Sequence, residues 1–328
     1  MKQRSHYISL LRGYVQCLVW FGLALGLRAG EVAKDEPPHQ LRIATVGNSF
    51  HNWLPMVLQQ VESLTPIKGH EQVANSYIGG SRVLDHWEVP DEKNTIKAAL
   101  CAGGVDVLTL GARLTPDEGI EKFVTLGLAH NPQLRVTLQD IWLPFDRLDR
   151  FSDGAECYGP QANLLRDWSD PPPSSTDPKA ALKETAAFNI PTAKQLERLH
   201  AVYFDKMDRY VVEENRKLGK QVLYVVPVGQ AVIALRKLIA DGKVPEIPKQ
   251  SDLFADKLGH PKSVIRALSA YCHFAVIYHQ SPVGLPLLPS LEREHFSAEL
   301  NHLLQQLAWE KVSQHPSSGV SGGGVLTK

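Results

Sequence analysis

The sequence has few cysteines and no surplus of charge of either sign. Its 328 residues include four cysteines, and 35 Lys and Arg balance 35 Asp and Glu. Four cysteines are too few for a disulfide scaffold in a chain of this length. Cys101 and Cys272 lie in apolar helical patterns, which predicts buried thiols. A chain with no net charge lacks the excess of basic residues that binds nucleic acid, so we expect no nucleic-acid partner.

The N-terminal residues have the pattern of an export signal. Three basic residues precede an 11-residue apolar run at 17–27, and small residues follow at 29 and 30. A membrane-spanning helix needs about 20 apolar residues, so the run is short for that role. The pattern predicts a signal peptide at 1–29 and a secreted or periplasmic protein, with an uncleaved membrane anchor as the alternative. Cleavage would remove four basic and no acidic residues, which shifts the charge from zero to −4.

After a polar linker at 30–40, short apolar runs alternate with helical patterns. Strands are predicted at 41–46, 72–78, 105–110, 134–142 and 221–226. Helices are predicted at 52–65, 94–101, 116–130, 192–218, 229–240, 261–278 and 290–312. This alternation is typical of an α/β fold, with a parallel sheet covered by helices on both faces.

Two segments interrupt or end this pattern. Residues 146–191 contain a Pro-rich stretch and little periodicity, which predicts an irregular surface insertion of the kind that often forms a lid or binding loop. Residues 313–328 are predicted to be a disordered tail. We therefore expect one catalytic domain over 41–312.

The residue after each strand matters most, because ligands of parallel sheets bind beyond the carboxyl ends of the strands. Gly47, Asn48 and Ser49 follow the first strand. A serine between a strand and a helix is well placed as a nucleophile, with its own N–H near the helix N-terminus. The alternative is a serine that only caps the helix.

The second and third strands end in residues that suit an anionic oxygen. Gly79 and Gly80 follow the second strand and would let a backbone N–H approach a ligand closely, unless they only form a turn. Arg113 follows the third strand. Its guanidinium group would reach the ligand-binding crevice beyond the strand ends, unless the side chain is a solvated surface charge.

A candidate base lies near the C-terminus. His260 directly precedes Pro261, and Asp256 lies four residues upstream. Histidine is the usual general base because it titrates near neutrality, and an aspartate can orient its ring. The alternatives are a helix-capping histidine and a surface aspartate.

Taken in order, these motifs resemble the SGNH hydrolases, also called the GDSL esterase and lipase family. The resemblance covers roughly residues 41–278 and includes Val226-Pro-Val-Gly229 after the fifth strand. It implies a three-layer α/β/α sandwich with a central, mostly parallel sheet of about five strands, which is flavodoxin-like. It also implies an enzyme without a cofactor or metal.

By position, the resemblance assigns a role to each motif. Ser49 matches the nucleophile, and its N–H together with that of Gly79 or Gly80 would bind the oxyanion. Asp256 and His260 would complete the triad.

The sequence departs from the family pattern at two places. The third block lacks its usual asparagine and reads Gly111-Ala112-Arg113-Leu114, so either Arg113 replaces that donor or the backbone supplies all donors. Asp256 lies four residues before His260 instead of three. Either Gly259 absorbs the extra residue, or Asp252 orients the ring, or His260 acts in a Ser–His dyad.

We therefore expect an exported serine esterase that removes a small acyl group, possibly acetyl, from a small molecule or polysaccharide. A catalytically weak carbohydrate-binding relative is the first alternative, in which Trp53, Trp87 and Trp142 would stack on sugars. A lipase-type enzyme is the second. No metal is expected, because no His-Glu-x-x-His or Cys-x-x-Cys pair occurs.

Overall fold

A five-stranded parallel sheet forms the centre of the fold. The computed structural model describes residues 41–112, 115–142, 189, 192–256 and 258–320. The strands are β1 (Arg42–Gly47), β2 (Glu71–Tyr77), β3 (Val107–Leu110), β4 (Arg135–Gln139) and β5 (Leu223–Val226). Their order is β2-β1-β3-β4-β5, the flavodoxin-like order of a doubly wound sheet. The predicted fold class is confirmed.

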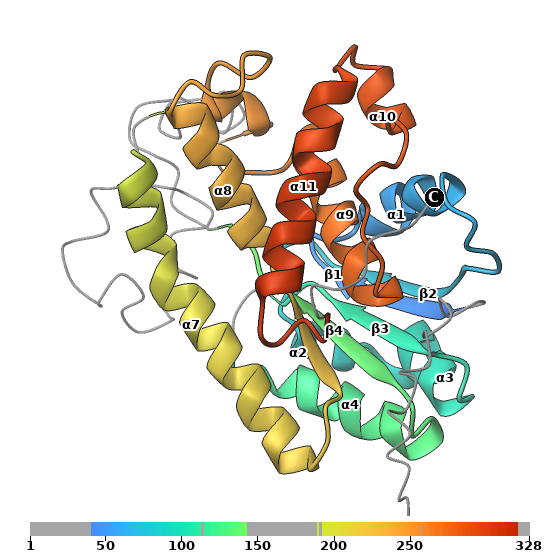
Figure 1. The fold of residues 1–328 in the computed structure, drawn as a ribbon. Helices are drawn as coiled ribbons and strands as arrows, with labels where there is room; N and C mark the ends of the chain where they lie inside the picture. The colour runs from blue at the N-terminus through green and yellow to red at the C-terminus, as the bar shows by residue number, and fades with distance from the viewer. Residues whose placement is uncertain (1–40, 113–114, 143–188, 190–191, 257, 321–328) are drawn as a thin grey trace, which may run out of the picture. The chain divides into compact units, whose positions relative to one another are not determined.

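Helices cover both faces of this sheet (Figure 1). They are α1 (Leu54–Ser63), α2 (Val83–Trp87), α3 (Thr95–Cys101), α4 (Glu118–His130), α7 (Ala193–Leu218), α8 (Val228–Ala240), α9 (Ser263–Tyr278), α10 (Pro289–Glu292) and α11 (Ala298–Gln314). The helices α1, α8, α9 and α11 pack together on one face, whereas α2, α3 and α4 lie on the other. The long helix α7 runs beside β5 and contacts α8. Short 3-10 turns occur at η1 (Asp91–Lys93) and η5 (Gln250–Leu253).

The apolar runs of the sequence are buried because both faces of the sheet are covered. Every residue of β3 is buried. Helix α9 is apolar on nearly all sides, and every residue from Val264 to Tyr278 except Arg266 is buried between α1, α8 and α11. The core therefore extends through α9, and the loop before this helix stands on a rigid support.

The C-terminal region differs from its prediction in two respects. The single helix expected at 290–312 is two helices, because His295 adopts a φ of 62° and Ser297 then caps the start of α11. The predicted tail does not begin at Ser313: α11 continues to Gln314, and the carbonyl of Ser317 accepts a hydrogen bond from Val225 of β5 at 2.9 Å. Residues 321–328 lie outside the described part of the chain.

Of the two cysteines predicted to be buried, one is buried and the other is exposed. Cys272 is buried in α9, as expected, but Cys101 at the end of α3 is exposed. Its helix ends there, and the following glycine turn leaves the side chain open to solvent. The predicted signal peptide, the linker and, apart from Asn189, the insertion lie outside the described residues. None of the helices that the structure describes is long and apolar enough to cross a membrane.

Candidate active site

Ser49, His260 and Asp256 form a continuous hydrogen-bonded chain at the carboxyl end of the sheet. His260 Nε2 lies 2.8 Å from Ser49 Oγ. On the other side of the ring, His260 Nδ1 lies 2.6 Å from Asp256 Oδ2. The serine follows β1 and the other two residues precede α9, so the fold joins groups that are 211 residues apart. This arrangement has the connectivity of a nucleophile, its base and the group that orients the base.

A closed loop holds the acid and the base together. Phe254 and Pro261 form an antiparallel bridge at its neck, and the N–H of Ala255 donates to the carbonyl of His260 at 2.8 Å. Gly259 adopts a φ of 82°, which favours glycine and takes up the extra residue between Asp256 and His260. The longer spacing is therefore compatible with a direct carboxylate–imidazole bond.

The competing aspartate lies elsewhere. Asp252 is exposed, and its carboxylate accepts from the N–H of Lys249 at 3.2 Å in the 3-10 turn η5. Asp256 is the carboxylate that meets His260.

The Asp256 carboxylate is held ionised. Partial burial by itself would raise the pKa of this carboxyl, but the hydrogen bond and electrostatic interaction with His260, together with two backbone hydrogen bonds, outweigh that effect. The N–H groups of Leu258 and His260 also donate to Oδ1, at 3.0 and 3.2 Å. The net effect is a pKa below the usual range of an aspartate.

The turn that carries Ser49 is fixed by Asn48. The buried Asn48 amide accepts from the N–H of Phe50 at 3.0 Å and donates to the carbonyl of Ser81 at 3.1 Å. These bonds tie the turn after β1 to the turn after β2. Within the described part of the chain, no hydrogen bond engages the N–H of Ser49. This N–H is therefore available to an anionic oxygen.

The predicted glycines lie beside the serine turn. The N–H of Ile78 donates to the carbonyl of Gly47 at 3.3 Å, which places Gly79 and Gly80 next to the Ser49 turn. Gly80 adopts a φ of 67°. The third predicted donor, Arg113, lies outside the described residues.

A buried polar network of Gln139, His51 and His273 contacts the serine turn on its core side. The amide nitrogen of Gln139, at the end of β4, donates to the carbonyl of Phe50 at 3.0 Å. Its oxygen therefore faces the rings of His51 and His273, at 2.9 Å from His51 Nδ1 and 3.0 Å from His273 Nε2. The other ring nitrogen of His51 meets Thr109 Oγ1 at 3.0 Å.

Both histidines of this network are neutral. Burial lowers the pKa of His51 to about 4 and that of His273 well below its usual value. Sequence reasoning missed the network. Its signals were a glutamine at the end of a buried strand and a histidine within the apolar helix α9.

His51 also packs tightly against two glycines, which gives a prediction. A Cβ built on Gly111 would lie 2.6 Å from the Cβ of His51, and one on Gly47 would lie 2.7 Å from it. A Gly111→Ala variant must displace His51 and the serine turn. We expect a loss of about 1–3 kcal/mol in the free energy of unfolding and a fall in kcat of up to about 10²-fold, measured by urea unfolding and ester hydrolysis.

A nearby glycine supplies the control for this variant. At Gly104, the nearest atom to an added Cβ is a carbonyl oxygen 3.6 Å away. Gly104→Ala should therefore change neither quantity appreciably. Equal stability and equal kcat in the Gly104 and Gly111 variants would show that His51 does not hold the serine turn.

Aromatic side chains support the base. The Phe50 ring lies between those of Trp142 and His260, with centroid distances of 5.4 and 5.1 Å. Trp142 Nε1 donates to the carbonyl of Gly259 at 2.8 Å. Trp142 and Trp53 are buried, so the prediction that they stack on sugars is wrong: the core needs their apolar surface. Trp87 packs edge-on against Phe123.

A buried aspartate lies at the end of β4. Asp140 accepts a hydrogen bond from the N–H of Gly229 at 2.7 Å. Burial raises the pKa of Asp140 to about 7, although nearby His315 and the Gly229 N–H act in the opposite direction. An aspartate in the unfolded chain has a pKa of about 3.9. Between about pH 4 and pH 7, Asp140 therefore keeps its proton in the folded protein and releases it in the unfolded chain.

The pKa difference at Asp140 predicts how stability depends on pH. The contribution of Asp140 is present in full below about pH 4 and is lost as pH rises to 7, because only the folded state keeps the proton. Between pH 5 and 8.5 the loss amounts to about 2–3 kcal/mol. Asp140→Asn should remove this slope and still accept from Gly229. Urea unfolding of the wild type and the variant at the two pH values measures this change. An equal change in the free energy of unfolding in both proteins would contradict the prediction.

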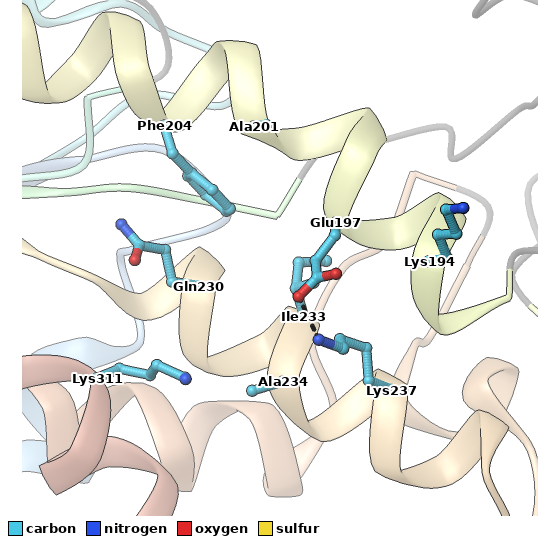
Figure 2. Close-up of a pocket in the computed structure, with 9 residues that line it drawn as sticks. All are labelled: Lys194, Glu197, Ala201, Phe204, Gln230, Ile233, Ala234, Lys237 and Lys311. Carbon is cyan, nitrogen blue, oxygen red and sulfur yellow. Dashed lines mark hydrogen bonds and ion pairs between the residues drawn. The ribbon is translucent and has the colours of Figure 1, made fainter.

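A cavity among the described residues lies away from the triad. It measures about 500 Å³ and is lined by residues of α7, α8 and α11 (Figure 2). An ion pair between Lys237 and Glu197 joins α8 to α7 along its wall. None of the triad residues lines it. Within the described ranges, no group of three or more His, Cys, Asp or Glu could hold a metal ion.

Comparisons with known proteins give matches to solved structures alone. No protein-family model and no curated protein matches the sequence. A protein from Slackia heliotrinireducens with the provisional name SGNH hydrolase is 14% identical, with a TM-score of 0.39, over 72% of this chain and 97% of that one. A provisionally named GDSL-like lipase from Parabacteroides merdae is 11% identical, with a TM-score of 0.38, over 74% and 97%. WcbI, a polysaccharide biosynthesis enzyme, is 14% identical, with a TM-score of 0.39, over 76% and 73%.

Proposed function

We propose that the protein is an exported serine esterase that hydrolyses small acyl esters. The observation that carries the proposal is the chain of hydrogen bonds from Ser49 Oγ through His260 to Asp256, with distances of 2.8 and 2.6 Å. It lies beyond the carboxyl end of β1, where parallel sheets bind their ligands. The N-terminal basic and apolar pattern supports export.

The geometry supports acyl transfer in two halves. His260 Nε2 takes the proton of Ser49 as Oγ attacks the ester carbonyl, and Asp256 stabilises the imidazolium that forms. The tetrahedral intermediate collapses to an acyl-serine, and the leaving alcohol takes the proton from His260. A water molecule then attacks the acyl-serine, with His260 again accepting a proton. His260 returns this proton to Ser49 Oγ as the carboxylic acid leaves, which restores the serine hydroxyl and the neutral imidazole.

The developing oxyanion would be bound by backbone donors. The N–H of Ser49 is available, and the Gly79–Gly80 turn adjoins it. One such donor is typically worth about 2.7–4 kcal/mol of transition-state stabilisation. Arg113 follows buried Ala112 and remains the proposed third donor or an anchor for a charged substrate group. An acetyl group on a carbohydrate is the substrate that we favour.

A direct assay tests this function. The purified protein should hydrolyse a short-chain chromogenic acetate, and a Ser49→Ala variant should be slower than the wild type by about 10⁶-fold. Acetylated saccharides and longer acyl esters, assayed in parallel, would define the acyl length. Equal rates from the two proteins would reject the esterase function.

A further inference from the structure

A second cavity adjoins the loop that holds the acid and the base. It measures about 450 Å³, which lies in the range of small-ligand sites. The residues that line it are Met56, Val57, Gln60, Ala255, Pro261, Lys262, Ser263, Arg266, Ser290, Arg293 and Glu294. Ala255 directly precedes Asp256, and Pro261 directly follows His260. One wall of the cavity is therefore the neck of the triad loop.

The cavity has an excess of positive charge. Lys262, Arg266 and Arg293 line it against a single carboxylate, that of Glu294. This carboxylate already accepts a hydrogen bond from Ser263 Oγ at 2.6 Å. A wall with two more cations than anions favours a negatively charged ligand.

Arg266 is the most confined of these cations. Its Nε donates to the carbonyl of Pro261 at 3.0 Å, and its guanidinium lies 6.0 Å from the centre of the Trp53 ring. Its two terminal nitrogens make no hydrogen bond to other residues in the part of the chain that the structure describes. A half-buried guanidinium with unused donors is suited to bind a carboxylate or a similar planar anion.

Two further groups at the cavity lack partners. The Ser290 hydroxyl is closed off from solvent and has no hydrogen-bond partner among the described residues. The start of α9, at Ser263, has no side-chain cap. The helix dipole adds partial positive charge at this end of a 16-residue helix.

We propose that this cavity is a subsite for an anionic group of the substrate, which makes carboxylate-bearing carbohydrate esters the preferred substrate class. The inference rests on the proposed esterase function. Ala255 and Pro261, which line the cavity, flank Asp256 and His260 in the chain, so the anionic sugar would be a neighbouring unit of the same oligomer as the reacting ester. Arg266 supplies the hydrogen bonds, while Lys262 and Arg293 supply the surrounding charge.

A matched pair of substrates tests the preference. One is an acetylated oligomer of a uronic acid, and the other is the same oligomer with its carboxyl groups reduced to alcohols. The protein should have a kcat/KM about tenfold higher for the acidic oligomer at low salt, and the ratio should shrink as salt screens the charges. In Lys262→Gln/Arg293→Gln, this ratio should fall toward one.

A variant with the same loss of charge is the control. Lys122→Gln/Arg209→Gln removes two surface cations of α4 and α7, each of which pairs with a carboxylate on its own helix. This variant should keep the preference for the acidic oligomer. An equal loss of preference in both double variants would overturn the subsite, because it would show a general effect of net charge.

Binding to a protein that cannot react separates the two proposals. Calorimetry with Ser49→Ala should show tighter binding of the acidic than of the reduced oligomer. Hydrolysis of both acetates without any preference would overturn the subsite and leave the esterase intact. Preferential binding without turnover of any ester would overturn the esterase and leave the subsite. Tight binding of inorganic phosphate, with no preference between the oligomers, would assign the cavity to a free anion instead.

Discussion

Replacing Ser49 by alanine should lower kcat for a small acetate by about 10⁶-fold, the scale seen when the nucleophile of a serine triad is removed. Without Oγ, no acyl-enzyme forms, and His260 has no hydroxyl to activate. The oxyanion donors remain in place, since they are backbone N–H groups. A residual rate of about 10³–10⁴-fold over the uncatalysed reaction should therefore persist.

Double replacement shows whether Ser49 and His260 act as one unit. Ser49→Ala/His260→Ala should be no slower than either single variant, because members of a triad are strongly non-additive. The thermal stability of Ser49→Ala should match that of the wild type, since Ser49 Oγ bonds to His260 in the partly exposed site and not in the core. If the fold-loss in kcat of the double variant equalled the product of the two single losses, Ser49 and His260 would act independently and not as a triad.

The fold was predictable because its local and global signals agree. The strands other than β2 read as short apolar runs, and the true bounds of the strands differ from the predicted ones by at most a few residues, as in β3 and β4. Burial on both faces makes such runs conspicuous. The break between α10 and α11 was not predictable, because it depends on the left-handed backbone of His295 within an otherwise helical pattern.

Part of the candidate site was predictable from topology alone. The carboxyl ends of parallel strands converge, so a serine after β1 and glycines after β2 had to lie close together. The family resemblance assigned Asp256 as the partner of His260 but left Asp252 open as an alternative, because the choice between them depends on the φ of 82° at Gly259.

The support beneath the site was hidden for a different reason. His51 lies in the serine turn, Gln139 ends a buried strand and His273 lies within an apolar helix, and none of these sequence contexts identifies the partner of the residue. Their bonds cross from β4 to the serine turn and to α9, and only the tertiary structure brings these elements together.

Replacing Asp256 by asparagine should lower kcat by about 10⁴-fold while KM changes little, the effect expected when a triad histidine takes the wrong tautomer. Oδ1 of Asp256 accepts from the N–H groups of Leu258 and His260, so the amide oxygen of the variant would keep that position. The amide nitrogen would then face His260 Nδ1 and donate to it. The remaining ring proton would move to Nε2, which could no longer accept the proton of Ser49.

The matched control for this variant is Asp252→Asn, which changes the same residue type four positions earlier, in the 3-10 turn η5. Asp252 is exposed and bonds to Lys249, so the variant should retain wild-type kcat. The loop should stay folded in both variants, because its bridge from Phe254 to Pro261 and the bond from Trp142 to Gly259 do not involve either carboxylate. A ring proton on Nε2 is visible by NMR of the histidine, which separates a tautomer change from misfolding. If Asp256→Asn kept full kcat, His260 would work without an orienting carboxylate, and the site would be a Ser–His dyad.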